Sequence, residues 1–102
     1  MPLPAVQDQQ LATALNRNES LGGLLQKVRE SQLRLQALAG LLPPALVGNV
    51  RAGPIDDTHW VLLVDHNAAA AKLRQMLPLL AEGLQAAGWA ERTIRIKVLP
   101  RA

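Results

Sequence analysis

The sequence of 102 residues contains no cysteine, so it can form neither disulfides nor thiolate metal sites. Two histidines, His59 and His66, are too few for a histidine-rich metal site. No apolar run approaches the roughly 18 residues of a membrane span, and the N-terminus lacks the basic start and apolar stretch of a secretion signal. We therefore expect a cytoplasmic protein that holds no metal and no cofactor.

Groups that could converge into a catalytic site are also scarce. Asp65 and His66 are neighbours, but successive residues of a strand point to opposite faces. The serines are not part of a G-x-S-x-G nucleophile elbow, and the chain contains neither a P-loop nor a dinucleotide-binding fingerprint. The pair Asp56-Asp57 fits a turn better than a metal site. The sequence therefore predicts a protein that is not an enzyme.

The charge of the chain is concentrated at one end. The net charge is +3, and the last fourteen residues carry an excess of the same size. A basic end favours a nucleic acid or another polyanion as partner, although a solvated basic surface is the alternative. With two tryptophans and no Phe or Tyr, aromatic stacking of bases has little to build on. The expected contacts are therefore to phosphates, with little base specificity.

The N-terminal half begins with a segment that has no sustained apolar face. Residues 1–19 are rich in proline and amides, and we expect a flexible leader there, followed by a single domain at 20–102. Ser20 is a good helix N-cap, and apolar residues at helical spacing follow it up to Gly40 or Pro43. A short helical turn is expected at Ala45–Gly48.

The C-terminal half alternates strands with a helix. Val50–Ile55 and His59–Asp65 are predicted to be two strands joined by a turn. Asn67 is expected to cap a long helix that runs to about Ala87 and is kinked at Pro78. The alternation in Thr93–Leu99 predicts a third strand.

The predicted fold class is α+β, in the order helix-strand-strand-helix-strand. A strand–helix–strand connection is right-handed and joins parallel strands, so we expect a KH-like, three-stranded mixed sheet with helices on one face. The other face would carry Arg95 and Lys97. It would also carry one set from the second strand, either Trp60, Leu62 and Val64 or Val61 and Leu63. The candidate partner-binding residues are Trp60, Leu62 and Val64.

These residues resemble a known family. The resemblance covers about residues 20–99 and is carried by Leu42-Pro43, by Trp60–Gln75 with its A-x-K-L-R-Q core, by Gly88 and by Thr93–Val98. This pattern is similar to that of a short form of the DciA-like family of bacterial replicative-helicase loaders. The resemblance implies a KH-like domain that binds DNA and contacts the helicase DnaB. Lys72 and Arg74 match the motif of that family, and Arg95 and Lys97 match its basic final strand.

The sequence thus leads to two functional hypotheses. The first is a replication accessory protein that binds single-stranded or tailed DNA, with little sequence specificity, and assists loading of DnaB. The second is a protein-interaction module, or a self-associating one, with no nucleic-acid role. For the first hypothesis the candidate phosphate contacts are Lys27, Arg29, Arg34, Arg51, Lys72, Arg74, Arg92, Arg95, Lys97 and Arg101.

Overall fold

The structure, a computed structural model, describes residues 20–101. The leader expected at residues 1–19 and the last residue of the expected domain lie outside the described residues. The elements in chain order are α2 (Leu21–Leu38), α3 (Pro44–Val47), β1 (Val50–Ile55), β2 (His59–Val64), α4 (Asn67–Gln75), α5 (Leu77–Ala86) and β3 (Thr93–Val98). None of the helices within residues 20–101 is both long and apolar enough to span a lipid bilayer.

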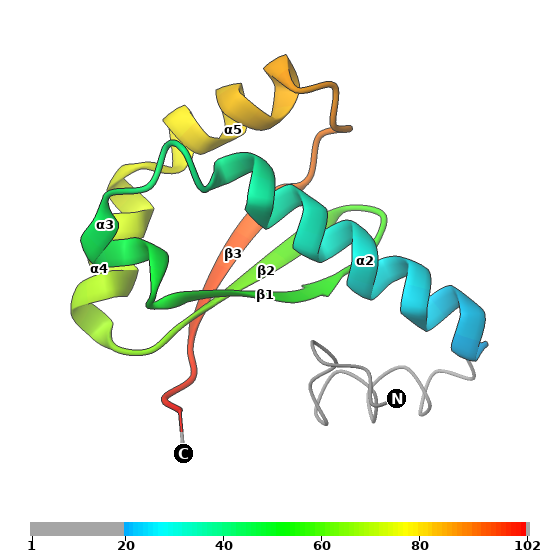
Figure 1. Ribbon diagram of the computed structural model, residues 1–102, viewed down its shortest axis with the longest axis horizontal. Coiled ribbons are helices and arrows are strands. Elements are labelled where there is room, and N and C mark those ends of the chain that lie inside the picture. Colours follow the sequence, from blue (N-terminus) through cyan, green and yellow to red (C-terminus); the bar gives the residue numbers. More distant parts are fainter. Residues whose placement is uncertain (1–19, 102) are drawn as a thin grey trace.

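The three strands form one mixed sheet in the order β1-β2-β3. β1 and β2 pair antiparallel as a hairpin, and β3 adds parallel to β2 with an unbroken register from His59↔Thr93 to Val64↔Val98. Figure 1 shows α2 running along β1 and extending past the hairpin end of the sheet. The α+β, KH-like architecture predicted from the sequence is therefore confirmed.

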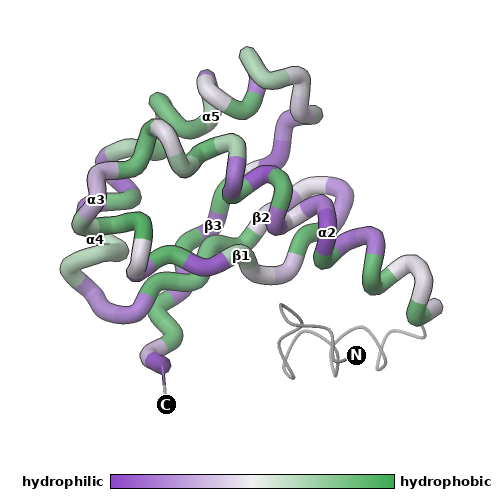
Figure 2. Tube along the Cα trace, in the orientation of Figure 1, coloured by the Kyte–Doolittle hydropathy of each residue, from purple (hydrophilic) through white to green (hydrophobic). Residues whose placement is uncertain are grey.

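The hydrophobic core lies between the sheet and the helices. From β2, Trp60, Leu62 and Val64 are fully buried, and Leu73 of α4 and Leu80 of α5 pack against them. Burial of these large apolar side chains is the main force that holds the helices on one face of the sheet. Along the tube in Figure 2, the last part of the loop that leads from α5 into β3 is hydrophilic, because Glu91 and Arg92 lie there.

The second helical region differs from the prediction in two ways. The cap of α4 is His66, whose Nδ1 accepts from the Ala69 N–H at 3.1 Å, and not Asn67. The expected kinked helix is two helices, and Met76, with φ −94° and ψ −4°, is both the C-cap of α4 and the N-cap of α5. Pro78 then lies in the first turn of α5, where its missing N–H leaves no helical hydrogen bond unmade.

A buried polar network ties α2 to the hairpin. The Trp60 indole N–H donates to Ser31 Oγ at 2.8 Å, and the Ser31 hydroxyl donates to the Gly53 carbonyl at 2.6 Å. Gly53 lies where the register of β1 shifts. A Cβ at this glycine would lie 2.8 Å from the Val61 carbonyl oxygen, so only glycine lets the two strands approach this closely.

The hairpin turn is organised by the Asp56 carboxylate. Its Oδ1 accepts from the backbone N–H groups of Thr58, at 2.8 Å, and His59, at 2.7 Å, and from the Thr58 hydroxyl. These hydrogen bonds, the one from the Thr58 backbone first, lower the pKa of Asp56 from 3.8 to about 2. The charged carboxylate is therefore the form that the folded turn stabilises.

Substitution Asp56→Asn is expected to make the hairpin less stable near neutral pH and to change nothing in strong acid. Because the folded pKa is depressed, the stabilisation is complete above 3.8 and is lost as the pH falls toward about 2. The carboxylate is well exposed, so we expect a loss of only about 1 kcal/mol in the free energy of unfolding. Urea denaturation of both proteins across this pH range measures it, and a gap that persists at the acid end would contradict the assignment.

Candidate nucleic-acid interface

The face of the sheet opposite the helices is lined by one alternate set of side chains. In the strand register, Arg51 of β1, Leu63 of β2 and Lys97 of β3 form one row across the sheet. Val61 and Arg95 form the next row. Since directly paired residues point to the same side, this open face combines cationic and apolar side chains.

One end of the open face carries ion pairs to Asp65, which directly follows β2. Arg101 Nε lies 3.1 Å from Asp65 Oδ1, and Arg51 Nη2 lies 3.4 Å from the same oxygen. Arg101 also donates to the Gly48 carbonyl at 3.0 Å, and Arg51 donates to the Leu99 carbonyl. These contacts hold the segment after β3 against the sheet and partly neutralise both arginines.

Arg95 and Lys97 are the most available cations of the open face. Both are exposed, and within residues 20–101 neither forms an ion pair with a carboxylate. Arg95 Nη2 lies 3.4 Å from His59 Nε2, which places an imidazole ring beside it. Alternate residues of a strand lie about 6.6 Å apart, so these two side chains can contact separate phosphates.

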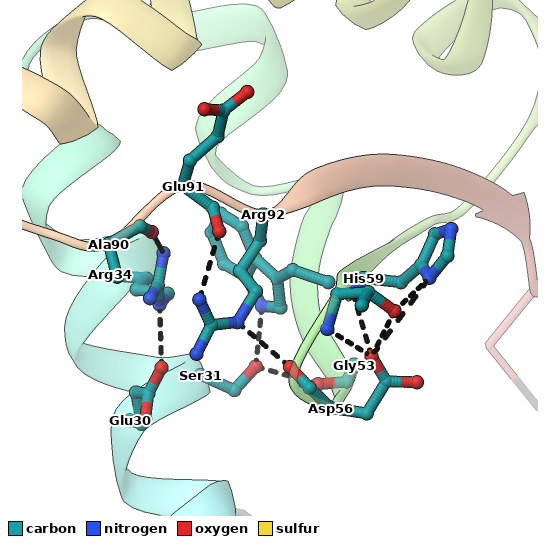
Figure 3. Close-up of polar contacts among 11 residues, drawn as sticks. Glu30, Ser31, Arg34, Gly53, Asp56, His59, Ala90, Glu91 and Arg92 are labelled. Atoms are coloured by element: carbon teal, nitrogen blue, oxygen red, sulfur yellow. Dashed lines mark hydrogen bonds and ion pairs between the residues drawn. The ribbon is translucent and has the colours of Figure 1, made fainter.

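Arg34 was expected to contact nucleic acid, and its position contradicts this. The side chain is 2% exposed; its Nε donates to Glu30 at 2.9 Å and its Nη1 donates to the Ala90 carbonyl at 3.0 Å. The guanidinium also lies 5.0 Å from the centre of the Trp89 ring. Figure 3 shows the side chain between Glu30 and Ala90. Arg34 therefore joins α2 to the loop before β3, and no ligand can reach it.

The remaining predicted contacts are spread over the molecule. Lys72 and Arg74 are exposed on α4, which covers the face of the sheet opposite Arg95 and Lys97. Lys27 and Arg29 lie on α2, one half-buried and the other exposed. In the loop before β3, Arg92 donates to the carbonyls of Asp56 and Glu91, each at 2.9 Å (Figure 3). The predicted cations do not form one patch.

The predicted partner-binding set was placed on the wrong face of β2. Trp60, Leu62 and Val64 are fully buried against the helices, because this set contains the bulkiest side chain and its indole N–H finds a partner in Ser31. The open face instead carries Val61 and Leu63. The sequence contained a signal for this arrangement. Val61 and Leu63 alternate with the other set and so share a face with the polar residues His59 and Asp65, which favour the solvent side.

The turn between the two adjacent helices α4 and α5 has its own sequence. KH domains that clamp a nucleic-acid backbone use a G-x-x-G loop, whereas only Met76 separates α4 from α5 here, and the sequence around it, Gln75-Met76-Leu77-Pro78, contains no glycine. The cationic groups of the open sheet face are therefore the stronger candidate for contact with a polyanion.

Comparison with known protein families identifies a match. The sequence profile of the family described as "Dna[CI] antecedent, DciA" matches residues 9–98 of the 102-residue chain. The matched range contains every helix and strand described above. No curated protein matches the sequence.

Proposed function

This chain belongs to the DciA family, and from that premise we propose that it is a non-enzymatic DNA-replication accessory protein that binds DNA and assists loading of the replicative helicase DnaB. The observation that carries the DNA-binding part is the pair of exposed cations Arg95 and Lys97 on the open face of the sheet, neither of which forms an ion pair with a carboxylate of residues 20–101. Between the cationic strands, the half-buried Val61 offers a small apolar area for a sugar or base, whereas Leu63 is only 4% exposed.

The proposed binding mode is electrostatic. Lysine and arginine at the surface neutralise phosphates and release counterions, so affinity falls steeply with salt. Arg51 and Arg101 border the same face, but each forms an ion pair with Asp65, which competes with a phosphate for the guanidinium. We therefore assign the main phosphate contacts to Arg95 and Lys97, with little discrimination between base sequences.

The double substitution Arg95→Glu with Lys97→Glu is expected to weaken binding to single-stranded DNA by at least about ten-fold at low salt. Loss of two phosphate contacts should also lower the slope of log K against log salt by about 1.4 on single strands. Fluorescence anisotropy over a series of salt concentrations measures both quantities, and circular dichroism shows that the variant is folded.

A matched control is available on α4. The double substitution Lys72→Glu with Arg74→Glu changes the net charge by the same amount but on the helical side of the molecule. It should lower affinity by only about two-fold, through the long-range field. Equal losses in both variants would show that binding depends on net charge alone and would reject the open face as the interface.

The helicase part of the proposal has its own experiment. Size-exclusion chromatography of the purified chain with DnaB of the same bacterium, at moderate salt, should give a co-eluting complex. The complex should survive nuclease treatment, since a contact bridged by DNA would not. Separate elution of the two proteins would reject helicase contact by this chain while leaving the DNA-binding experiment to be judged independently.

A further inference from the structure

The outer edge of β3 has unused backbone hydrogen-bonding groups. The N–H of Thr93 donates to the Thr58 carbonyl, and the N–H of Leu99 donates to the Val64 carbonyl, both at 2.8 Å. In a parallel pair, alternate residues of a strand bond the same neighbour. The backbone groups of the intervening residues therefore point away from β2, namely those of Ile94, Ile96 and Val98. Among residues 20–101, no group forms a hydrogen bond with these outward backbone N–H and carbonyl groups.

In the part of the chain that the structure describes, this edge of the sheet is open, whereas the opposite edge is not. β1 contains Pro54 and a register shift between Ala52 and Ile55, and the Gly53 carbonyl already accepts from Ser31. Such features prevent the pairing of a further strand. β3 is a regular strand of six residues without proline or bulge. It has the geometry that a further strand needs.

The side chains of β3 define what the further strand must be. Arg95 and Lys97 are exposed on the open face, and Ile94, Ile96 and Val98 are half-buried toward the helices. We propose that the free edge of β3 binds an extended segment of another protein, with acidic and apolar residues in alternation, as a fourth strand. Its acidic side chains would lie beside Arg95 and Lys97, and its apolar ones would complete the partly covered core.

A second copy of this chain does not fit the same edge. In antiparallel pairing of two β3 strands, the aligned registers place Arg95 opposite Arg95 or Lys97 of the other copy. Like charges directly opposite one another destabilise a strand pair. The two cations therefore disfavour self-pairing and favour an acidic partner. The proposal depends on backbone pairing and would stand even if the chain bound no DNA.

The first experiment maps the site. A capped synthetic peptide of alternating valine and glutamate is added to the isotope-labelled protein, and amide hydrogen exchange is followed by NMR. In the free protein the outward amides of Ile94, Ile96 and Val98 should exchange faster than those of Arg95 and Lys97. The peptide should slow exchange at the outward amides by at least about ten-fold. Protection elsewhere in the molecule, or none, would overturn the proposal.

The second experiment removes one outward donor. Ile96→Pro deletes an N–H that β2 does not use, and Ile96→Ala is the matched control, since it loses the same side chain and keeps the N–H. Peptide affinity of the proline variant should be about ten-fold below that of the alanine variant. A peptide with lysine in place of glutamate should bind neither the proline variant nor the alanine variant. Equal affinities of the two variants would reject strand addition.

A third arm leaves the protein unchanged, in case the proline variant does not fold. N-methylation of the peptide at the residues whose N–H faces β3 should abolish binding, and N-methylation at the intervening residues should not. Equal effects of the two methylated peptides would reject the proposal. Sedimentation of the free protein tests whether a second copy of the chain pairs with this edge instead. A dimer that the Ile96→Pro substitution dissociates would show that it does and would overturn the proposal.

Discussion

Substitution Ser31→Ala is expected to lower the free energy of unfolding by about 3 kcal/mol, because it leaves two buried groups without partners. Ser31 is 2% exposed and Trp60 is fully buried. The Ser31 hydroxyl accepts a hydrogen bond from the Trp60 indole N–H and donates one to the Gly53 carbonyl. Alanine satisfies neither group and the site is too closed for water to replace the hydroxyl. The midpoint of thermal unfolding should fall by roughly 15 °C for a domain of this size.

A double-mutant cycle separates the network from general packing. In Trp60→Phe the indole N–H is gone, so Ser31→Ala on that background leaves only the Gly53 carbonyl unpaired. The second substitution should then cost about half of what it costs in the wild type. Urea denaturation of the four proteins gives the coupling energy. Strictly additive effects would mean that the indole–hydroxyl hydrogen bond contributes nothing to stability.

The fold was predictable because its local signals agree with one another. The Ser20 cap, the alternation of β3 and the apolar run of β2 each specify an element independently of the rest. The helical crossover between β2 and β3 then favours the parallel pairing that the sheet shows. The break at Met76 was missed because Pro78 suits the first turn of a new helix as well as a kink, and sequence alone gives no preference between them.

The candidate site was predictable only in part. Alternation along β3 places Arg95 and Lys97 on one face of the strand, independently of how the other elements pack. The cations of the other elements depend on how helices rotate and cross, which periodicity cannot give. Arg34 shows this most clearly: it follows Leu33, which is exposed, and it is itself buried. Its partners Ala90 and Trp89 are far away in sequence, so no local pattern predicts their meeting.

Substitution Arg34→Ala is expected to destabilise the protein without weakening its binding to DNA. The guanidinium joins Glu30 of α2 to the Ala90 carbonyl of the loop before β3 and packs over Trp89. Loss of one partner of a buried ion pair usually costs about 3–5 kcal/mol. We expect about 3 kcal/mol, at the low end of that range, because the Glu30 side chain is 34% exposed and can be hydrated once unpaired.

Substitution Arg34→Met is the matched control, because it keeps a long side chain over Trp89 and removes the charge. The methionine substitution should lower the free energy of unfolding less than the alanine substitution does. The difference should be roughly 1–2 kcal/mol, because methionine keeps the apolar packing over Trp89. Urea denaturation gives the free energies of unfolding, and anisotropy under conditions where each variant is folded gives the DNA affinity. Both variants should match the wild type in affinity and in salt slope, in contrast to the double substitution at Arg95 and Lys97. A stable Arg34→Ala variant with weakened, less salt-dependent binding would instead make Arg34 a phosphate contact that opens to DNA.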